Sequence, residues 1–270
     1  MRRCWHVLLL LTVAWSWCGS ACWGQDADKP AAAAPVEAAP QEKVAPDPAE
    51  KAVVDALRKL GARVRMNADG KVDNVEVSSA KITDEDLPPL KKLPALESLD
   101  IGGGRITDAG LANLKGMTSL VRLYLHDMKI TDAGLKHLRD LVNLECLNLQ
   151  KTQVTSKGLA NLEPLVNITI LNLADTKVDD KGLAYLKRMA DLDTLSVENT
   201  QVTGAGLVHL KVLAKLRTLN LRNCSVNDKD LDHLLGLREL RMLYLKGTKV
   251  NEDHIDEFKD KMVSLAIFFY

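Results

Sequence analysis

Apolar residues recur eight times with a fixed period of 24 positions, beginning at Val72. In each copy they occupy the first, fourth and sixth positions, and mostly polar residues lie between them. The eight copies are Val72, Val75, Val77; Leu96, Leu99, Ile101; Leu120, Leu123, Leu125; Leu144, Leu147, Leu149; Ile168, Leu171, Leu173; Leu192, Leu195, Val197; Leu216, Leu219, Leu221; and Leu240, Leu243, Leu245. Alternation of this kind predicts a short β-strand with one buried face in every copy.

A second apolar column lies ten residues after the start of each strand and is Ile or Val in all eight copies. The next residue is always Thr, Asp or Asn, whose short side-chain oxygens can cap a helix N-terminus. An acidic residue follows in six copies, which suits the first turn of a helix. Apolar residues then recur three apart, as at Leu111, Leu114 and Met117. Each copy therefore predicts a strand, a turn, a capped helix and a return, and the copies must stack to bury their apolar faces.

Residues 144–167, LECLNLQKTQVTSKGLANLEPLVN, represent the full pattern LxxLxLxxTxVTDxGLxxLxxLxx. This pattern resembles the leucine-rich-repeat family, and most closely its cysteine-containing subclass found in F-box proteins. Threonine in place of cysteine and the N-terminal segment are more similar to exported repeat proteins of planctomycete-type bacteria. The resemblance covers residues 72–270. It implies an α/β, right-handed, curved solenoid with parallel strands on the concave side and helices on the convex side. It implies binding only as a tendency of the family.

The first 24 residues have the layout of a secretory signal peptide, with two arginines, an apolar run and then small residues. Cleavage is possible after Ala21 or after Gly24. An uncleaved anchor is the main alternative, because residues 4–24 contain no Asp, Glu, Lys or Arg and about 20 apolar residues can span a bilayer. Attachment of a lipid to Cys22 is a third possibility.

The remaining boundaries follow changes in composition. Residues 25–48 are rich in Ala and Pro and poor in large apolar side chains, which predicts a disordered tether. Residues 49–71 predict an N-terminal cap, a helix followed by the first strand of a hairpin. The repeats occupy residues 72–254, and residues 255–270 predict a C-terminal cap. Residues 264–269 predict a degenerate last strand, and Phe268, Phe269 and Tyr270 are expected to cover the end of the core rather than to form a contact site.

Charge and motifs narrow the function classes. The chain has 36 basic and 36 acidic residues, so its overall charge favours neither nucleic acid nor an acidic partner. It contains no nucleotide-binding loop, no nucleophile elbow and no HExxH pair. Acidic residues such as Asp179 and Asp180 are explained by helix capping and the first helical turn. We therefore expect no enzymatic activity and no cofactor.

Histidines and cysteines provide the only candidates for metal or thiol chemistry. His137, His209 and His233 share one helix column, but no carboxylate or cysteine completes a ligand set there, so a polar surface column is favoured over a metal site. Cys146 and Cys224 lie three repeats apart, about 14 Å in a regular solenoid, which is too far for a disulfide. Cys224 is expected to be a small buried residue. Cys146 belongs to the concave face and is accessible in principle.

The strand positions between the apolar ones are expected to form the concave face. Two groups of residues on this face have the types enriched at binding hot spots, and amide side chains lie between them. The candidate binding residues are Arg122, Tyr124, His126, Asn148, Asn172, Asn220, Arg222, Met242, Tyr244 and Lys246. Glu76 and Asp100 make one end of the face acidic, whereas Arg222 and Lys246 make the other end basic, which favours a single docking orientation.

Together these features predict an exported leucine-rich-repeat module that binds a protein partner through its concave face. We expect a monomer located in the periplasm, the cell envelope or the extracellular space, without nucleic acid. Membrane association is expected only if the N-terminal segment is retained. The alternatives are an intracellular F-box-like substrate receptor and a structural or glycan-binding envelope protein.

Overall fold

A computed structural model of the chain describes residues 48–77, 81–262 and 265–269. The signal or anchor expected at residues 1–24 lies outside the described residues, as does the expected tether apart from Pro48. Pro48 is the first residue of a helix rather than the last residue of a linker, which suits a side chain that lacks an N–H group. In the described ranges, no helix has both the length and the apolar character needed to cross a membrane.

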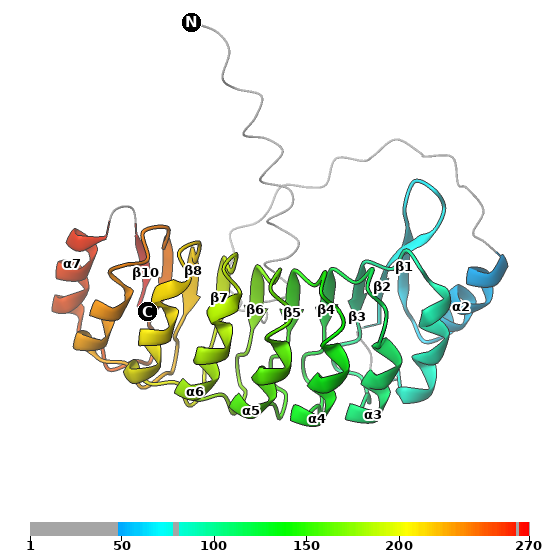
Figure 1. The fold of residues 1–270 in the computed structure, drawn as a ribbon, viewed down its shortest axis with the longest axis horizontal. Coiled ribbons are helices and arrows are strands. Elements are labelled where there is room, and N and C mark those ends of the chain that lie inside the picture. The colour runs from blue at the N-terminus through cyan, green and yellow to red at the C-terminus, as the bar shows by residue number, and fades with distance from the viewer. Residues whose placement is uncertain (1–47, 78–80, 263–264, 270) are drawn as a thin grey trace, which may run out of the picture.

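The described residues form one sheet of ten strands whose spatial order equals their order in the sequence (Figure 1). The strands are β1 (Arg63–Met66), β2 (Val72–Glu76), β3 (Ser98–Asp100), β4 (Arg122–Tyr124), β5 (Cys146–Asn148), β6 (Ile170–Asn172), β7 (Thr194–Ser196), β8 (Thr218–Asn220), β9 (Met242–Tyr244) and β10 (Ala266–Phe268). β1 pairs antiparallel with β2, and every later pair is parallel. This arrangement confirms the predicted α/β leucine-rich-repeat solenoid with a 24-residue repeat.

Helical segments cover one side of the sheet, which is the convex side of the solenoid (Figure 1). The α-helices are α2 (Pro48–Lys59), α3 (Asp108–Leu111), α4 (Asp132–Leu135), α5 (Ser156–Leu159), α6 (Asp180–Leu183) and α7 (Glu252–Lys261). The 3-10 segments are Asp84–Asp86, Pro88–Lys92, Ala112–Leu114, Lys136–Leu138, Ala160–Leu162, Ala184–Arg188, Gly204–Val212 and Asp228–Leu234. Four repeats, from α3 to α6, therefore have a single α-helical turn that continues as a 3-10 turn, and the repeats with the segments 84–92, 204–212 and 228–234 have 3-10 turns alone. Narrow 3-10 turns fit a stack whose strands are about 4.8 Å apart better than α-helices about 10 Å wide do.

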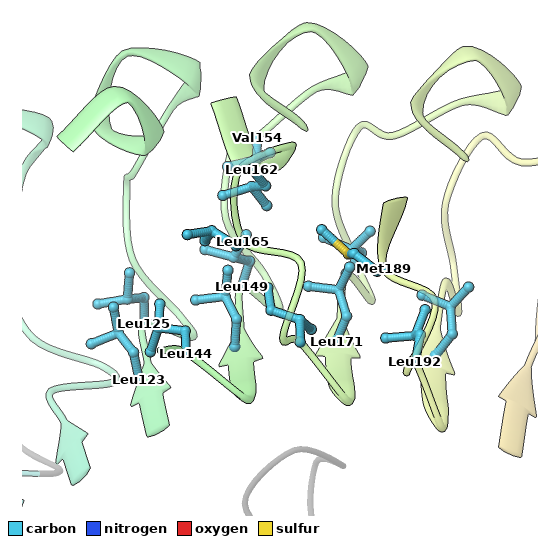
Figure 2. Packing of buried hydrophobic residues seen from close by; sticks show 14 of the residues in the cluster. Leu123, Leu125, Leu144, Leu149, Val154, Leu162, Leu165, Leu171, Met189 and Leu192 are labelled. Carbon is cyan, nitrogen blue, oxygen red and sulfur yellow. The ribbon is translucent and has the colours of Figure 1, made fainter. Parts of the chain in front are cut away.

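The core consists of leucine columns that run along the solenoid. The middle strand residues are paired in register, so Leu123, Leu147 and Leu171 stack in adjacent repeats, and all three are fully buried. Figure 2 shows side chains of neighbouring repeats, including Leu149, Leu165 and Met189, filling the space between the strands and the convex segments. Because each repeat contributes the same layer, stability comes from contacts between neighbours.

A ladder of carboxylates joins successive repeats on the convex side. The Asp in the first turn of one helix accepts two hydrogen bonds from the N-cap threonine of the next repeat, one from its backbone N–H and one from its hydroxyl. For Asp132 and Thr155 these distances are 2.7 and 2.6 Å. The same pairing joins Asp84 to Thr107, Asp108 to Thr131 and Asp180 to Thr203, and Asp228 bonds Asn251 in the same way. We call this set the carboxylate ladder.

A column of glycines makes room for the ladder. A Cβ atom placed on Gly158 would lie 2.3 Å from a carboxylate oxygen of Asp132, and one on Gly206 would lie 2.4 Å from Asp180. Gly110 and Gly134 meet the same obstacle. A side chain at these positions would therefore push the carboxylate away from the threonine that it caps.

The ladder has two exceptions, and in each of them the usual residue types of two neighbouring positions are swapped. Ser156 occupies a position that is usually Asp, and Asp179 occupies one that is usually Thr. The Ser156 hydroxyl therefore donates to the Asp179 carboxylate, and the Asp179 N–H donates to Ser156 Oγ at 2.9 Å. Further along, Gly204 occupies the Asp position and Asp230 the glycine position. Asp230 then caps Asn227 within its own repeat at 2.8 Å, so the ladder bond between these two repeats is missing.

Different elements cover the two ends of the core. At the start, α2 buries Val53, Val54 and Leu57, and the buried Glu50 accepts the backbone N–H of Val72 at 3.0 Å. This bond attaches the first helix to the first parallel strand. At the far end, α7 buries Phe258, and β10 adds a last strand to the sheet.

Candidate binding surface on the concave face

The middle strand residue of each repeat points into the core, and the residues on either side of it point to the concave face. The ten candidate residues lie on this face at β4, β5, β6, β8 and β9 or just after them. Their exposure differs more than the sequence suggests. Lys246 is exposed, and Arg122, His126, Arg222, Met242 and Tyr244 are half-buried. Tyr124, Asn148, Asn172 and Asn220 are buried.

The three buried asparagines correct the expectation that amides on this face are open to a ligand. The Oδ1 atoms of Asn148, Asn172 and Asn220 accept the backbone N–H two residues later, at 2.9, 3.0 and 3.0 Å. In the same way, Asp100 Oδ1 accepts the backbone N–H of Gly102. Asn and Asp commonly form this local turn, so their side chains shape the end of each strand. The position of these Asn and Asp residues at the end of each predicted strand, where a turn follows, was a signal for this bond in the sequence.

The turns that follow the strands form a polar rim. Asp127, Lys151, Asp175, Asn199 and Asn223 have positive φ angles between 51° and 57°, a conformation that Asn and Asp tolerate better than most residues. Side chains on this rim bond along the solenoid, as Asn199 Nδ2 does to Asp175 at 2.6 Å. This column was not predicted from the sequence, although its Asp and Asn content is typical of turns.

At the C-terminal end, three planar groups stack across β8, β9 and β10. The guanidinium carbon of Arg222 lies 4.9 Å from the ring centroid of Tyr244, close enough for a cation–π contact. On its other side, Tyr244 stacks on Phe268 with 4.5 Å between ring centroids and 13° between ring planes. Burial raises the pKa of the Tyr244 hydroxyl, and the nearby Arg222 partly opposes this shift. We call Arg222, Tyr244 and Phe268 the C-terminal cluster.

Phe268 differs from its expected role as a cover for the core. Its side chain is 41% exposed, and it extends the concave surface. Met242 lies beside the cluster, with its sulfur 4.0 Å from the Tyr244 hydroxyl. An arginine and two aromatic rings held in register form a surface of the composition found at binding hot spots.

At the other end of the face, the candidates take part in ion pairs. Arg122 lies 3.9 Å from Glu97. His126 lies between two carboxylates, 3.7 Å from Asp100 and 3.0 Å from Asp127. The His126 ring also covers Gly102, because a Cβ atom there would lie 2.2 Å from Nε2. Of the two residues that predicted an acidic end, Glu76 is paired with Arg63, and the Asp100 carboxylate lies beside His126.

The histidine column does not assemble a recognisable ligand set. His137, His209 and His233 are half-buried on the convex side. In the part of the chain that the structure describes, no group of three or more His, Cys, Asp and Glu side chains is placed to hold a metal ion.

Both cysteines of the repeats are buried as free thiols, so Cys146 is less accessible than its concave position suggested. Cys224 Sγ donates to the Val197 carbonyl at 3.0 Å, and burial raises the pKa of this thiol. We expect native Cys224 to react with a water-soluble thiol reagent at least about 100-fold more slowly than in denaturant, because the thiolate is the reactive form. Peptide mapping by mass spectrometry after timed labelling measures this rate. Rapid labelling of the native protein would contradict the buried position.

A family model described as Leucine Rich repeat matches residues 92–115 and 166–187. Among solved structures, the chain is similar to internalin C2 from Listeria monocytogenes, with a TM-score of 0.63 and 23% identity over 85% of this chain and 100% of that one. It is also similar to a leucine-rich-repeat protein of Leptospira interrogans, with a TM-score of 0.54 and 18% identity over 67% of this chain and 45% of that one.

At these identities the structural similarities establish the fold alone. No curated protein sequence matches the chain. The matched family model covers two of the repeats and specifies neither the F-box-type subclass nor a bacterial group. The repeat pattern, the ten-stranded solenoid and the matched repeats together show that this chain has a leucine-rich-repeat fold.

Proposed function

We propose that this chain is an exported, non-enzymatic binding module that holds a protein partner on its concave face. The C-terminal cluster is the observation that carries the proposal. Arg222 and Tyr244 are held 4.9 Å apart, and Tyr244 is supported from behind by Phe268, so their positions are fixed before any partner arrives. Fixed side chains lose less conformational entropy on binding than mobile ones do.

The chemistry of the cluster favours a polypeptide partner. Aromatic ring faces contact apolar and planar side chains, and an arginine held by a cation–π contact can still present N–H groups to carboxylates and carbonyls. Lys246, which is exposed beside the cluster, adds a second positive charge. A partner segment with an acidic residue next to an apolar or aromatic one therefore fits this end of the face best.

The export part of the proposal is supported by the first 24 residues, whose charged start, apolar run and small residues are typical of a signal peptide. It places the protein in the periplasm, the cell envelope or the extracellular space. A retained segment would attach it to a membrane instead. Cell fractionation with N-terminal sequencing of the mature protein tests this part, and an intact chain in the cytoplasm would contradict it.

We expect Tyr244→Ala to weaken capture of the partner about 30-fold, equivalent to about 2 kcal/mol, because a central hot-spot aromatic and its cation–π contact are lost together. Affinity capture uses the immobilised chain and an extract of the envelope and growth medium. Quantitative mass spectrometry identifies proteins that bind the native chain, and titration with the purified candidate gives the dissociation constant. Arg222→Ala is expected to weaken binding as well, and more strongly at low salt than at high salt.

Lys211→Ala provides the matched control, since Lys211 is exposed on the convex side and is not part of the C-terminal cluster. It should leave capture unchanged. A partner retained by the Tyr244 and Arg222 variants but lost in a convex-side variant would place the binding site on the helical side and overturn the concave proposal. If only a glycan is captured, the glycan-binding alternative replaces a protein partner. Capture of an F-box adaptor would favour the intracellular receptor.

A further inference from the structure

Among the described strands, β10 has one edge that no other strand covers. β10 pairs with β9 on one side, and the sheet formed by the described residues does not continue on the other. The Ala266 N–H donates to the Arg241 carbonyl, and the Phe268 carbonyl accepts from the Leu245 N–H, so both residues bond towards β9. Consecutive residues of a strand direct their backbone groups to opposite sides. The N–H and C=O groups of Ile267 are therefore directed towards the open edge.

The opposite edge of the sheet is protected. Its outer strand, β1, carries Arg63 and Arg65, which pair with Glu76 and Asp73 of β2. Charged residues on an edge strand discourage pairing with another chain. In contrast, β10 contains no charged residue, and Phe268 is one of the few large apolar side chains in the described residues that are strongly exposed. The edge strand β10 is therefore better suited than β1 to pair with a strand of another chain.

We infer that β10 is the interface through which two copies of this chain form an antiparallel, two-fold symmetric dimer. If Ile267 lies on the symmetry axis, it faces Ile267 of the second copy as a hydrogen-bonded pair, in which both N–H and both C=O groups are satisfied. The same register sets Phe268 opposite Ala266 of the second copy. A large side chain then faces a small one on the concave side, twice, as an isologous interface requires.

The helix behind β10 favours the same symmetry. α7 has Glu252 and Asp253 in its first turn and Lys259 and Lys261 in its last turn. A two-fold axis perpendicular to the sheet would bring the two α7 helices side by side in antiparallel orientation. Each acidic first turn would then lie beside a basic last turn, whereas a parallel arrangement would place like charges together. The interface of one short strand and one helix is small, so we expect a dissociation constant of about 1–10 µM.

Such a dimer has a consequence for the concave face. The sheets of the two copies would become continuous, and the two C-terminal clusters would meet at the centre. The inference does not depend on what the concave face binds, because it rests on the free edge and on α7. It replaces the sequence-based expectation of a monomer.

Sedimentation velocity of the full chain at about 100 µM, well above the expected dissociation constant, tests the dimer. The native chain should sediment as a dimer and Ile267→Pro as a monomer, since proline removes an N–H group that faces away from β9 and is tolerated on an edge strand. A monomeric native chain, or a dimer that persists in Ile267→Pro, would overturn the inference. Circular dichroism of the variant establishes that its fold is retained.

Cysteine cross-linking tests the register and does not depend on the proline variant. In the inferred dimer the two Cα atoms at position 267 are about 5.5 Å apart, within the range of a disulfide, whereas those at position 266 are about 8 Å apart. Ile267→Cys should therefore give at least about tenfold more of the symmetric disulfide peptide than the matched control, Ala266→Cys. Equal yields from the two variants, or a higher yield at position 266, would contradict the Ile267-centred pairing.

Discussion

Replacing Leu147 with alanine is expected to lower the free energy of unfolding by about 3 kcal/mol, within the usual range of about 2–5 kcal/mol for buried leucines. Leu147 is fully buried at the centre of β5 and stacks between Leu123 and Leu171. The loss combines the transfer free energy of the deleted methyl groups with the cavity that they leave. The repeats on both sides pack against the Leu147 side chain, so they should also lose stability when it is replaced. Equilibrium urea unfolding followed by circular dichroism measures the change.

Val166→Ala is the matched control in the same repeat, because the Val166 side chain is 38% exposed. It should change the free energy of unfolding by less than about 0.5 kcal/mol. If Leu147→Ala were as mild as this control, the continuous leucine core would not be the main source of stability.

The second large effect is expected from Ser156→Asp, which should destabilise the fold by about 2–3 kcal/mol at neutral pH. Ser156 is buried and donates its hydroxyl hydrogen to the Asp179 carboxylate. An aspartate there removes this charge-assisted hydrogen bond and sets a second negative charge against the first. The repulsion is moderated because Asp179 is partly exposed.

The pH dependence of stability should reverse in this variant. In the native chain, the Ser156 hydrogen bond holds the pKa of Asp179 below its usual value. Its contribution to stability is therefore complete above the unfolded-state pKa, about 4, and is lost as the pH falls through the folded-state pKa. In Ser156→Asp, like-charge repulsion raises the pKa of the pair, so lowering the pH towards 4 should relieve the destabilisation. Urea unfolding at several pH values distinguishes the two cases.

Adding Asp179→Thr to Ser156→Asp recreates the pairing of Asp132 with Thr155 seen in the preceding repeat. The double variant should be within about 1 kcal/mol of the native chain, so the coupling between the two positions should be large. A double variant as unstable as Ser156→Asp alone would show that the carboxylate ladder does not explain the exchange.

The sequence was sufficient to predict the architecture because its period never varies. Apolar residues such as Leu123, Leu147 and Leu171 recur at the same position in every repeat, and no alternative fold buries all of these columns together. The strands could be located to within about two residues for the same reason. The spacing of the buried apolar residues determines the register of the parallel strands, so the sequence of each repeat was sufficient to predict that register.

The contacts between repeats were less predictable. Asp132 was interpreted as a first-turn carboxylate that favours its own helix, whereas it caps Thr155 in the next repeat. That interpretation treated each repeat alone, although positions 23 residues apart are neighbours in the stack. The same limitation affected Asn148, whose side chain was expected to be open to a ligand although its Oδ1 is bonded in the local turn. It also affected Phe268, which was expected to cover the core although it stacks on Tyr244. The binding role of the ten candidates remains a prediction.

The exchange of Gly204 and Asp230 has a consequence for motion. Between the repeats that begin at Leu192 and Leu216 the capping bond is local, so the carboxylate ladder does not hold the stack together there, whereas Asp228 still joins Asn251 one repeat further on. Backbone amides from Leu216 onward should therefore exchange with deuterated solvent together, ahead of those in β4 to β7. The whole C-terminal cluster belongs to this segment. A partner that contacts the cluster and also the concave face of β4 to β7 would hold the segment closed, and slower exchange across it would report that the whole face is occupied.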